Sequence, residues 1–332
     1  MRIHGLLVVR DEADIIAQCL RHAATWCDHI YVYDTGSTDG SWEIVQELAT
    51  ELKQVVPYKR EEVWFDDGLR AVIFDHYRSK ARDGDWFVRL DSDEFYPVPP
   101  SQFIREHLRP IESLIYYQAY EFRLTWEEVE NYSSDASILA DRKSPIQDRR
   151  RYFIPLVYSE PRLFRYRTGM SWLPTRPWPF NCGFAARERI PVQHYQHRDP
   201  IQMIQRFHLR NIMRRKMRIV NPAAIAHWDL TDWRSEVLKS SDERLVFWRH
   251  GSPLPPFHLS GHLAPVGRRA LQWALYRSCV RAIDATRPTF PLQYTPAPLP
   301  MDTTRELKNV PLRMCEAALA RAVQTWGDQS TS

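Results

Sequence analysis

Apolar and polar positions follow two regular patterns along the first 100 residues, and together they predict strands separated by helices. Short runs of branched and aromatic apolar residues, typical of buried strands, occupy residues 3–9, 29–33, 55–58 and 86–90. Between these runs, apolar residues recur at three- and four-residue intervals and predict three helices. The first has its apolar face from Ile15 to Ala23 and Asp11, Glu12 and Asp14 at its N-terminal end, the second follows Ser41 as the N-cap, and the third covers 69–82. Strands that alternate with helices at this spacing indicate a parallel, doubly wound sheet.

The pattern changes after residue 100. An apolar and aromatic segment covers 114–124, and the polar segment that follows it, 127–150, is long enough to be a flexible lid. Apolar residues on one side predict a helix over 200–218, and two more helices are expected near 264–284 and 305–326. We therefore expect an α/β fold in the first part of the chain and a mainly helical extension at its C-terminal end.

The composition fits a folded, globular protein. Of the 332 residues, 44% are hydrophobic and 26% are charged, which excludes disorder as a description of the whole chain. The net charge of +4 favours anionic partners such as phosphates, but it is smaller than the charge that nucleic-acid-binding proteins usually carry. We therefore expect no nucleic-acid partner.

Cysteine usage and hydropathy indicate the compartment. The five cysteines are odd in number, widely scattered and never spaced as C-x-x-C, so neither a disulfide framework nor a zinc site is predicted. No apolar segment approaches the length that spans a bilayer, and the apolar run at 6–9 is too short for a signal peptide. We expect a cytoplasmic protein, and any membrane contact that it makes would be peripheral and on the inner face.

Asp91 and Asp93 are the first candidates for chemistry. They follow the predicted strand at 86–90 directly, and ligands bind at the carboxyl ends of strands in open α/β sheets. Two carboxylates one residue apart on a turn can face one divalent cation, which prefers oxygen ligands. A solvated acidic turn is the alternative, because a three-residue motif often matches by chance. A calcium-binding EF-hand loop is excluded, since Tyr96 and Gln102 stand where that loop requires Gly and Glu.

A second acidic turn follows the second predicted strand, with the sequence D-T-G-S-T-D-G at residues 34–40. Asp34 could accept hydrogen bonds from a ribose or a base, while Gly36 and Gly40 allow the backbone to approach a ligand closely. An ordinary strand-to-helix turn has a similar composition. Two acidic turns at the ends of two strands of one predicted sheet favour a ligand site more than either turn does alone.

Three segments in this order resemble the family 2 glycosyltransferases, which are inverting enzymes of the GT-A fold with a D-x-D motif. The segments are V-V-R-D-E-A-D-I-I at 8–16, Y-D-T-G-S-T-D-G-S at 33–41 and G-D-W through D-S-D-E-F at 84–95. Asp11 stands where many members of the family have Asn. The resemblance covers roughly the first 100 residues and implies a GT-A-like, doubly wound, mostly parallel sheet flanked by helices.

The resemblance also implies roles for single residues. In that family the end of the first strand and the Asp after the second strand hold the nucleoside, so these roles fall to Val9, Glu12 and Asp34. Asp91 and Asp93 match the D-x-D motif. They would hold Mn²⁺ or Mg²⁺ against the diphosphate of a nucleotide-diphosphate sugar, and Asp91 would thereby also contact the donor.

The departing diphosphate and the attacking hydroxyl both need further groups. Glycosyl transfer passes through an oxocarbenium-like state, and an arginine can stabilise the negative charge that builds on the leaving diphosphate. Arg70 and Arg78 on the predicted helix before the D-x-D strand are candidates, with a solvated helix face as the alternative. Glu121 and Glu160, which have apolar neighbours, are candidates for the catalytic base, with a structural salt bridge as the alternative for each.

His194, in the sequence H-Y-Q-H-R, is the candidate for a third metal ligand. In many glycosyltransferases of this fold a His downstream of the D-x-D motif completes the metal shell, and the resemblance implies this role for His194. A structural His is the alternative. On an extended segment His194 and His197 would point to opposite faces, so they would not share one metal.

A basic amphipathic stretch at 211–218 could rest on anionic lipid or on an anionic glycan, with a solvated helix face as the alternative. Aromatic residues that could stack on sugar rings, or could equally belong to the core, include Trp172, Trp178, Tyr195, Trp228 and Trp233.

These features predict a metal-assisted, inverting glycosyltransferase that moves a sugar from a nucleotide-diphosphate sugar to a glycan, a lipid-linked saccharide or a protein hydroxyl. Residues 1–125 would form the nucleotide-sugar-binding half, 126–220 the acceptor-side half with its lid, and 221–332 the helical extension. A nucleotidyltransferase is one alternative, but that class usually has a Gly-rich, basic loop where R-D-E-A stands at 10–13. A non-catalytic binding module for anionic polymers is another, and it leaves the paired acidic turns unexplained.

Overall fold

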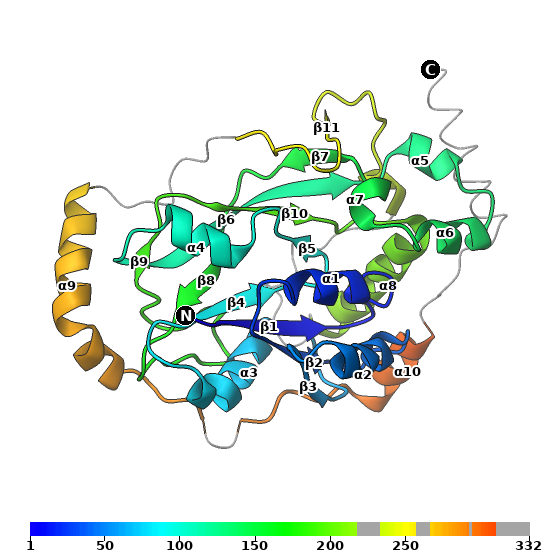
Figure 1. The fold of residues 1–332 in the computed structure, drawn as a ribbon. Coiled ribbons are helices and arrows are strands. Elements are labelled where there is room, and N and C mark those ends of the chain that lie inside the picture. Colours follow the sequence, from blue (N-terminus) through cyan, green and yellow to red (C-terminus); the bar gives the residue numbers. More distant parts are fainter. Residues whose placement is uncertain (218–232, 257–265, 292–293, 310–332) are drawn as a thin grey trace. The chain divides into compact units, whose positions relative to one another are not determined.

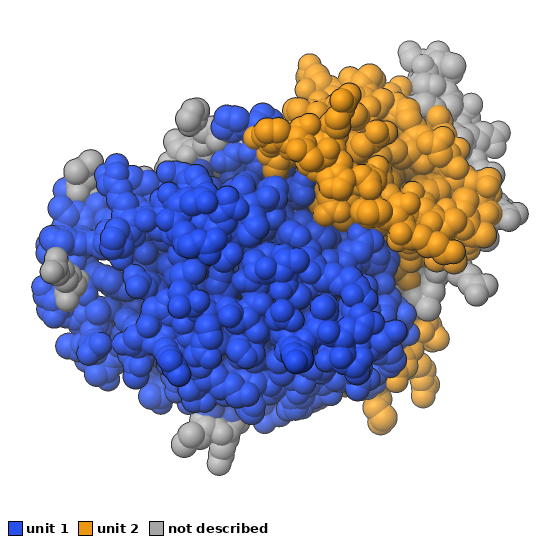
Figure 2. Space-filling view, viewed as in Figure 1, with its two compact units in different colours: residues 1–120, 155–194, 255–298 blue, residues 121–154, 195–254, 299–332 orange. Residues whose placement is uncertain are grey.

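The computed structural model describes residues 1–217, 233–256, 266–291 and 294–309. The chain divides into two compact units, coloured separately in Figure 2. Unit 1 comprises residues 1–120, 155–194 and 255–298, and unit 2 comprises 121–154, 195–254 and 299–332. The chain therefore passes repeatedly from one unit to the other instead of dividing at residues 125 and 220. The assignment of its parts to donor and acceptor stays a prediction.

Unit 1 is built on a sheet with the strand order β6-β8-β4-β1-β2-β3 (Figure 1). These strands are β1 (Ile3–Val9), β2 (His29–Asp34), β3 (Val55–Arg60), β4 (Trp86–Leu90), β6 (Glu112–Arg123) and β8 (Pro161–Arg165). β1 is parallel to β2 and β4, and β2 is parallel to β3, whereas β8 is antiparallel to β4 and β6. The predicted α/β, GT-A-like sheet is confirmed.

Side chains of the central strand alternate between two cores, one on each face of the sheet. Leu7 and Val9 belong to the cluster that includes Leu20 of α1 (Ile16–Ala23) and residues of α2 (Ser41–Glu51). Leu6 and Val8 belong to the other cluster, with α3 (Leu69–Tyr77). Because both faces are covered by helices, every β1 side chain is buried, which explains the unbroken apolar run in the sequence.

Shorter elements complete unit 1. They are η1 (Arg78–Lys80), β5 (Glu94–Phe95), α4 (Pro100–His107), β9 (Phe184–Ala185), β10 (Ile190–His194) and α9 (Val266–Ala285). β10 pairs with β5 in antiparallel register, with His194 opposite Glu94, so the residues after the D-x-D motif are held beside a strand from a distant part of the chain.

Unit 2 is mainly helical. Its elements are α5 (Trp126–Glu130), α6 (Asp135–Asp141), α7 (Ile146–Arg149), β7 (Tyr152–Pro155), α8 (Pro200–Met217), η3 (Trp233–Glu236), β11 (Val246–Phe247) and α10 (Met301–Lys308). Apolar residues of α5, α6, α8 and η3 form its core, which includes Trp126, Ile138, Phe207 and Trp233. The helix predicted over 200–218 is confirmed as α8.

The prediction of a flexible loop over 127–150 is wrong, because this segment contains α5, α6 and α7. Two capping boxes begin the first two helices: Thr125 pairs with Glu128 and Ser134 pairs with Ser137. In each, one side chain accepts a hydrogen bond from a backbone N–H that the helix cannot satisfy itself. The polar residues that cap these short helices have the same composition as a loop, which is why the sequence pattern predicted one.

Two other helix predictions need correction. Ser41 is the first residue of α2, and Gly40 with a φ of 98° is its N-cap, because the Ser41 hydroxyl is used by the neighbouring loop. Of the helix predicted at 305–326, the structure has α10 at Met301–Lys308, and residues 310–326 lie outside the described residues.

Candidate active site

Three strand ends meet at one edge of the unit 1 sheet. The parallel register aligns Val9 of β1 with Asp34 of β2, and Leu7 of β1 with Leu90 of β4. The loops that follow these strands therefore leave the sheet at the same edge, which is where open α/β sheets bind their ligands. Asp91 begins one of these loops.

Asp39 ties the loop after β1 to the loop after β2. Its carboxylate accepts hydrogen bonds from the backbone N–H of Ala13 at 2.8 Å and from the backbone N–H and hydroxyl of Ser41 at 3.0 and 2.6 Å. The Ser41 hydroxyl accepts a hydrogen bond from the backbone N–H of Glu12 at 2.8 Å. The half-buried Glu12 is therefore fixed at the sheet edge by its backbone. Sequence reasoning missed Asp39, whose only signal was its place in the acidic turn.

Asp11, at the position where the family often has Asn, adopts a φ of 52°, a conformation that Asn and Asp tolerate better than most residues. Its carboxylate accepts a hydrogen bond from the backbone N–H of Thr38 at 2.6 Å. Burial and the nearby charge of Asp39 raise the pKa of Asp11 to about 6. Two carboxylates thus share a small space between these loops.

Asp34 is fully buried at the end of β2. One carboxylate oxygen accepts hydrogen bonds from the backbone N–H groups of Gly36 and Ser37, both at 2.8 Å, and Gly36 needs its φ of 95° for this turn. The other oxygen, Oδ2, is buried and accepts no hydrogen bond within the described part of the chain. Burial raises the pKa of Asp34, opposed by the hydrogen bonds from Ser37 and Gly36. Oδ2 can therefore accept a hydrogen bond from a ligand hydroxyl or base N–H.

Val9, the other residue expected to contact the nucleoside, is buried at the end of β1. Its carbonyl oxygen already accepts hydrogen bonds from the backbone N–H and hydroxyl of Thr35, at 3.0 and 3.2 Å. Arg10 is also buried and donates to the carbonyl oxygen of Thr35. Val9 can therefore shape a nucleoside site, but both acceptor positions of its carbonyl oxygen are taken.

Asp91 lies between two buried arginines. Its Oδ1 forms an ion pair with Arg70 of α3, and its Oδ2 lies 3.3 Å from Nη2 of Arg162 of β8. Burial would raise the pKa of Asp91, but Arg70, Arg162 and Arg89 outweigh it and lower the pKa below its ordinary value. Asp91 is therefore ionised, and it can bind a metal ion only if it exchanges one of its arginine contacts.

Asp93 and His194 come together as predicted for the other two ligands. Oδ2 of Asp93 lies 3.5 Å from Nε2 of His194, and both side chains are largely buried. A carboxylate oxygen and an imidazole nitrogen at this separation fit as neighbouring ligands of Mn²⁺ or Mg²⁺. Among the described residues no group of three or more His, Cys, Asp or Glu side chains is arranged to hold a metal ion. The pair could supply two ligands to such an ion.

Arg162 joins Asp91 to two further carboxylates that surround it. It contacts Glu94 of β5, and its Nη1 lies 2.9 Å from Oε1 of Glu160. Burial raises the pKa of Glu94 to about 7, an effect that the positive charge of Arg162 opposes. The carboxylate of Glu160 is 37% exposed, so a substrate can reach it. Of the predicted catalytic bases, Glu160 thus belongs to the cluster around the D-x-D motif.

Arg89 is a third buried arginine in this cluster. Its Nη2 donates to Oδ1 of Asp67 at 3.1 Å, and its guanidinium lies over the ring of Trp178, 4.0 Å from the centroid. It also lies within 3.9 Å of Glu160. Sequence analysis proposed neither Arg89 nor Arg162 for the site. Arg89 sits inside an apolar strand motif, and Arg162 lies on an antiparallel strand whose partner the local pattern does not reveal.

Two predicted residues are not brought to this cluster. Arg78 of η1 forms an ion pair with Asp75 at 3.1 Å and donates to the carbonyl oxygen of Met170. Glu121 belongs to unit 2, where it is buried and paired with Arg123. Their roles in donor binding and catalysis stay predictions without geometric support.

The basic stretch at 211–218 is partly neutralised within unit 2. Arg215 pairs with Glu306 of α10, and Nζ of Lys216 lies 2.5 Å from Asp302 of the same helix. Arg218 lies outside the described residues. None of the helices within the described ranges combines the length and the apolar character that a membrane-spanning helix needs.

Comparison with known proteins places the strand ends described above in a family. Residues 6–165 match the model of glycosyl transferase family 2. A TPR repeat-containing protein of Synechococcus elongatus is 30% identical over 110 residues, which is 33% of this chain, and the chain spans 25% of that relative's length.

Comparison with solved structures gives a weaker similarity. A mannosyltransferase of Pyrobaculum calidifontis, solved in complex with GDP-Man and Mn²⁺, aligns over 100% of this chain and 88% of its own. The TM-score is 0.34 and the sequence identity is 11%. The fold assignment therefore depends on the family match and on the strand order.

Proposed function

Because residues 6–165 form a family 2 glycosyltransferase domain, we propose that the chain transfers a sugar from a nucleotide-diphosphate sugar to a hydroxyl group of a glycan, a lipid-linked saccharide or a protein. The transfer is a single displacement with inversion, and a divalent metal assists it. The observation that carries the proposal is the Asp93–His194 pair at the carboxyl edge of the sheet, beside Asp91 and its arginines.

The charges of the cluster support a cation there. The cluster contains three guanidinium groups and five carboxyl groups, so acidic side chains outnumber basic ones. The arginines are Arg70, Arg89 and Arg162, and the acids are Asp67, Asp91, Asp93, Glu94 and Glu160. An Mn²⁺ or Mg²⁺ ion held by Asp93 and His194 would offset this excess and neutralise charge on the leaving diphosphate. Arg70 and Arg162, already fixed by Asp91, are positioned to bind phosphate oxygens as the donor enters.

The nucleoside would bind at the neighbouring strand ends. The free acceptor atom of Asp34, Oδ2, is the best candidate to receive a hydrogen bond from the ribose or base. Glu12 borders the same loop, and Val9 contributes the floor of this site. Burial makes such a hydrogen bond strong, because an unpaired carboxylate oxygen in a dry site is costly.

Glu160 would take the proton of the acceptor hydroxyl. It is partly exposed, and it shares the guanidinium of Arg162 with Asp91, so it lies in the D-x-D cluster. An inverting displacement needs a carboxylate that accepts this proton as the new bond forms. The contact with Nη1 of Arg162 at 2.9 Å would hold the Glu160 carboxylate in place for this step.

The test is turnover of a panel of nucleotide-diphosphate sugars with Mn²⁺, with Mg²⁺ and with EDTA. The proposal expects release of a nucleoside diphosphate that EDTA abolishes, and a loss of about 100-fold or more in Asp93→Asn and in His194→Ala. If the two variants differed completely in their Mn²⁺ dependence, a shared metal would be ruled out. Release of a sugar phosphate in place of a nucleoside diphosphate would indicate a nucleotidyltransferase, and donor binding that EDTA does not change would indicate a binding module.

A further inference from the structure

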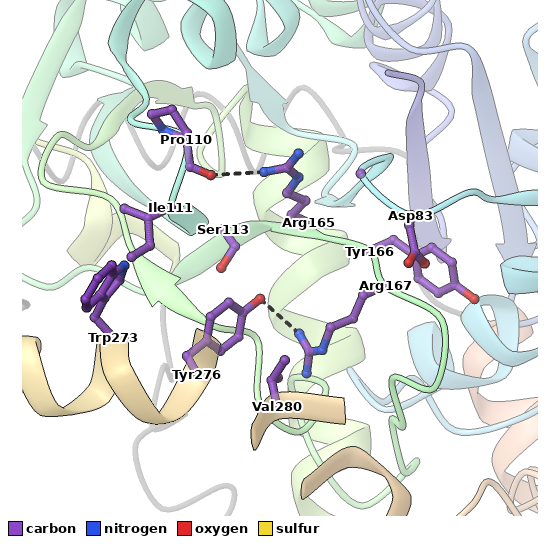
Figure 3. A pocket seen from close by; sticks show the side chains of 11 residues that line it. Asp83, Pro110, Ile111, Ser113, Arg165, Tyr166, Arg167, Trp273, Tyr276 and Val280 are labelled. Atoms are coloured by element: carbon purple, nitrogen blue, oxygen red, sulfur yellow. Dashed lines mark hydrogen bonds between the residues drawn. The ribbon is translucent and has the colours of Figure 1, made fainter. Parts of the chain in front are cut away.

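A cavity of about 550 Å³ lies in unit 1 at the other end of β4 from the D-x-D motif (Figure 3). Asp83 and Gly84 line it just before β4 begins, whereas Asp91 follows the strand. At about 3.3 Å per residue, a strand of this length separates the two places by more than about 15 Å. The volume is typical of sites that bind small molecules. The cavity is therefore separate from the candidate active site.

One wall of the cavity is α9, which an ion pair fixes in place. Arg167, which follows β8, reaches Asp284 of α9 through Nε and Nη2 at 2.5 and 2.8 Å, and both side chains are buried. Its Nη1 donates to the hydroxyl of Tyr276 at 3.3 Å (Figure 3). Gly183 lets Tyr276 pack this closely, because a Cβ at that position would overlap the Tyr276 hydroxyl and Ser113. Ionic, hydrogen-bonding and packing contacts thus hold α9 in place as this wall of the cavity.

The lining combines an aromatic ring with the positively charged side chain of Arg165. Trp273 of α9 is 40% exposed and contributes a ring to the cavity. Arg165 at the end of β8 donates to the carbonyl oxygen of Pro110 at 3.1 Å, and no ion pair between it and a carboxylate is seen within the described residues. The Tyr276 hydroxyl, beside Arg167, supplies a hydrogen-bonding group to the same cavity. A ring with an apolar face, several hydroxyls and one negative charge matches this arrangement.

We propose that this cavity binds one ring of an acidic saccharide, with its carboxylate or phosphate at Arg165 and its apolar face against Trp273. The choice of a saccharide over other ring-shaped anions rests on the proposed function. Because the cavity is remote from Asp93, the bound ring is not the reacting one. It anchors a distant unit of a glycan chain, which raises the local concentration of the acceptor.

The test is calorimetric titration of the full chain at low salt with cellobiouronic acid, with its neutral counterpart cellobiose, and with inorganic phosphate. We expect the acidic disaccharide to bind and cellobiose to bind at least about tenfold more weakly. Arg165→Gln and Trp273→Ala should each weaken the acidic disaccharide by about tenfold. Arg105→Gln, an exposed arginine of α4, and Leu271→Ala, an exposed residue of α9, are the matched controls and should not change its affinity.

Three results would overturn the proposal: no binding of the acidic disaccharide, equal binding by Arg165→Gln, or complete displacement by phosphate at the same concentration, which would mean a simple anion site. The titration is repeated with Asp93→Asn, and unchanged saccharide affinity is expected. If the chain binds the saccharide but transfers no sugar, only the proposed function is contradicted. If it transfers sugar but does not bind the saccharide, only the cavity proposal is contradicted.

Discussion

At the scale of single residues, Arg162 links the carboxylates that follow β4 to the carboxylate of Glu160, which lies more than 60 residues later in the sequence. It contacts Asp91 at 3.3 Å, Glu160 at 2.9 Å, and Glu94. Since all these groups are partly or fully removed from water, removing the arginine would leave several like charges close together. The side chain therefore fixes the position of these acids, and its charge lowers the pKa of Asp91 and opposes the rise in the pKa of Glu94.

Glu160→Gln tests the catalytic base among these acids. The amide keeps the shape of the side chain but cannot accept the hydroxyl proton, so we expect kcat to fall by about 100-fold to 10,000-fold with little change in the KM of the donor. The exposed Glu188, which pairs with His107, provides the control variant Glu188→Gln, with wild-type kinetics expected. A loss of stability with normal kcat would mean that Glu160 is only a salt-bridge partner.

Asp11→Asn tests the crowded carboxylates of the two loops. The folded-state pKa of Asp11, about 6, lies above its ordinary value, so this group contributes stability below pH 4 that is lost as the pH rises through 6. Asn keeps the acceptor for Thr38 and tolerates the φ of 52°. We expect the variant to be more stable than the wild type by about 1–2 kcal/mol at pH 8, with the difference disappearing near pH 4.

Urea denaturation at several pH values measures this difference. Glu47→Gln, at an exposed position of α2, is the matched removal of one carboxylate and should leave the difference near zero at every pH. If the difference in the free energy of unfolding between Asp11→Asn and the wild type were the same at pH 8 and at pH 4, the raised pKa of Asp11 would be contradicted.

At the scale of elements, local patterns determine most of unit 1 and less of unit 2. The apolar runs of β1, β2 and β4 are buried on both faces of the sheet, so each is unmistakable in the sequence. By contrast, α5, α6 and α7 are short and begin with polar capping boxes, and that composition is also typical of loops. Apolar residues of α5 and α6 pack in one core with residues of α8, a contact that no local sequence pattern predicts.

Ser134→Ala tests whether the capping box holds α6. The Ser134 hydroxyl accepts a hydrogen bond from the backbone N–H of Ser137 at 3.4 Å, so its loss should lower the free energy of unfolding by about 1 kcal/mol. Chemical denaturation followed by the fluorescence of tryptophans such as Trp126 and Trp233 in the unit 2 core measures the change. The adjacent Ser133 is exposed, and Ser133→Ala should change it by less than about 0.5 kcal/mol. Equal effects would show that the cap does not stabilise the helix.

At the scale of the whole molecule, the candidate site draws on segments that are distant in sequence but belong to one compact unit. Asp34 and Asp91 could be predicted because each follows a strong strand signal. Arg162 and His194 depend on strand pairings with β4 and β5, which span more than 70 residues of sequence, so their contacts follow from the topology and not from local spacing. Only the resemblance to a family indicated His194 in advance.

A nucleotide-diphosphate sugar and its metal should therefore stabilise the folded chain as a pair. A ligand that binds only the native state at 100 times its Kd adds about 2.7 kcal/mol to the free energy of unfolding. We expect the correct donor to raise Tm by several degrees with Mn²⁺ and by much less with EDTA, because the Asp93–His194 pair binds the diphosphate only through the ion. Asp93→Asn should lose the Mn²⁺-dependent part of the shift, whereas Arg165→Gln, at the remote cavity, should keep it in full. A donor-induced shift that is the same with Mn²⁺ and with EDTA would mean that the arginines alone bind the diphosphate, and the metal would then have no part in donor binding.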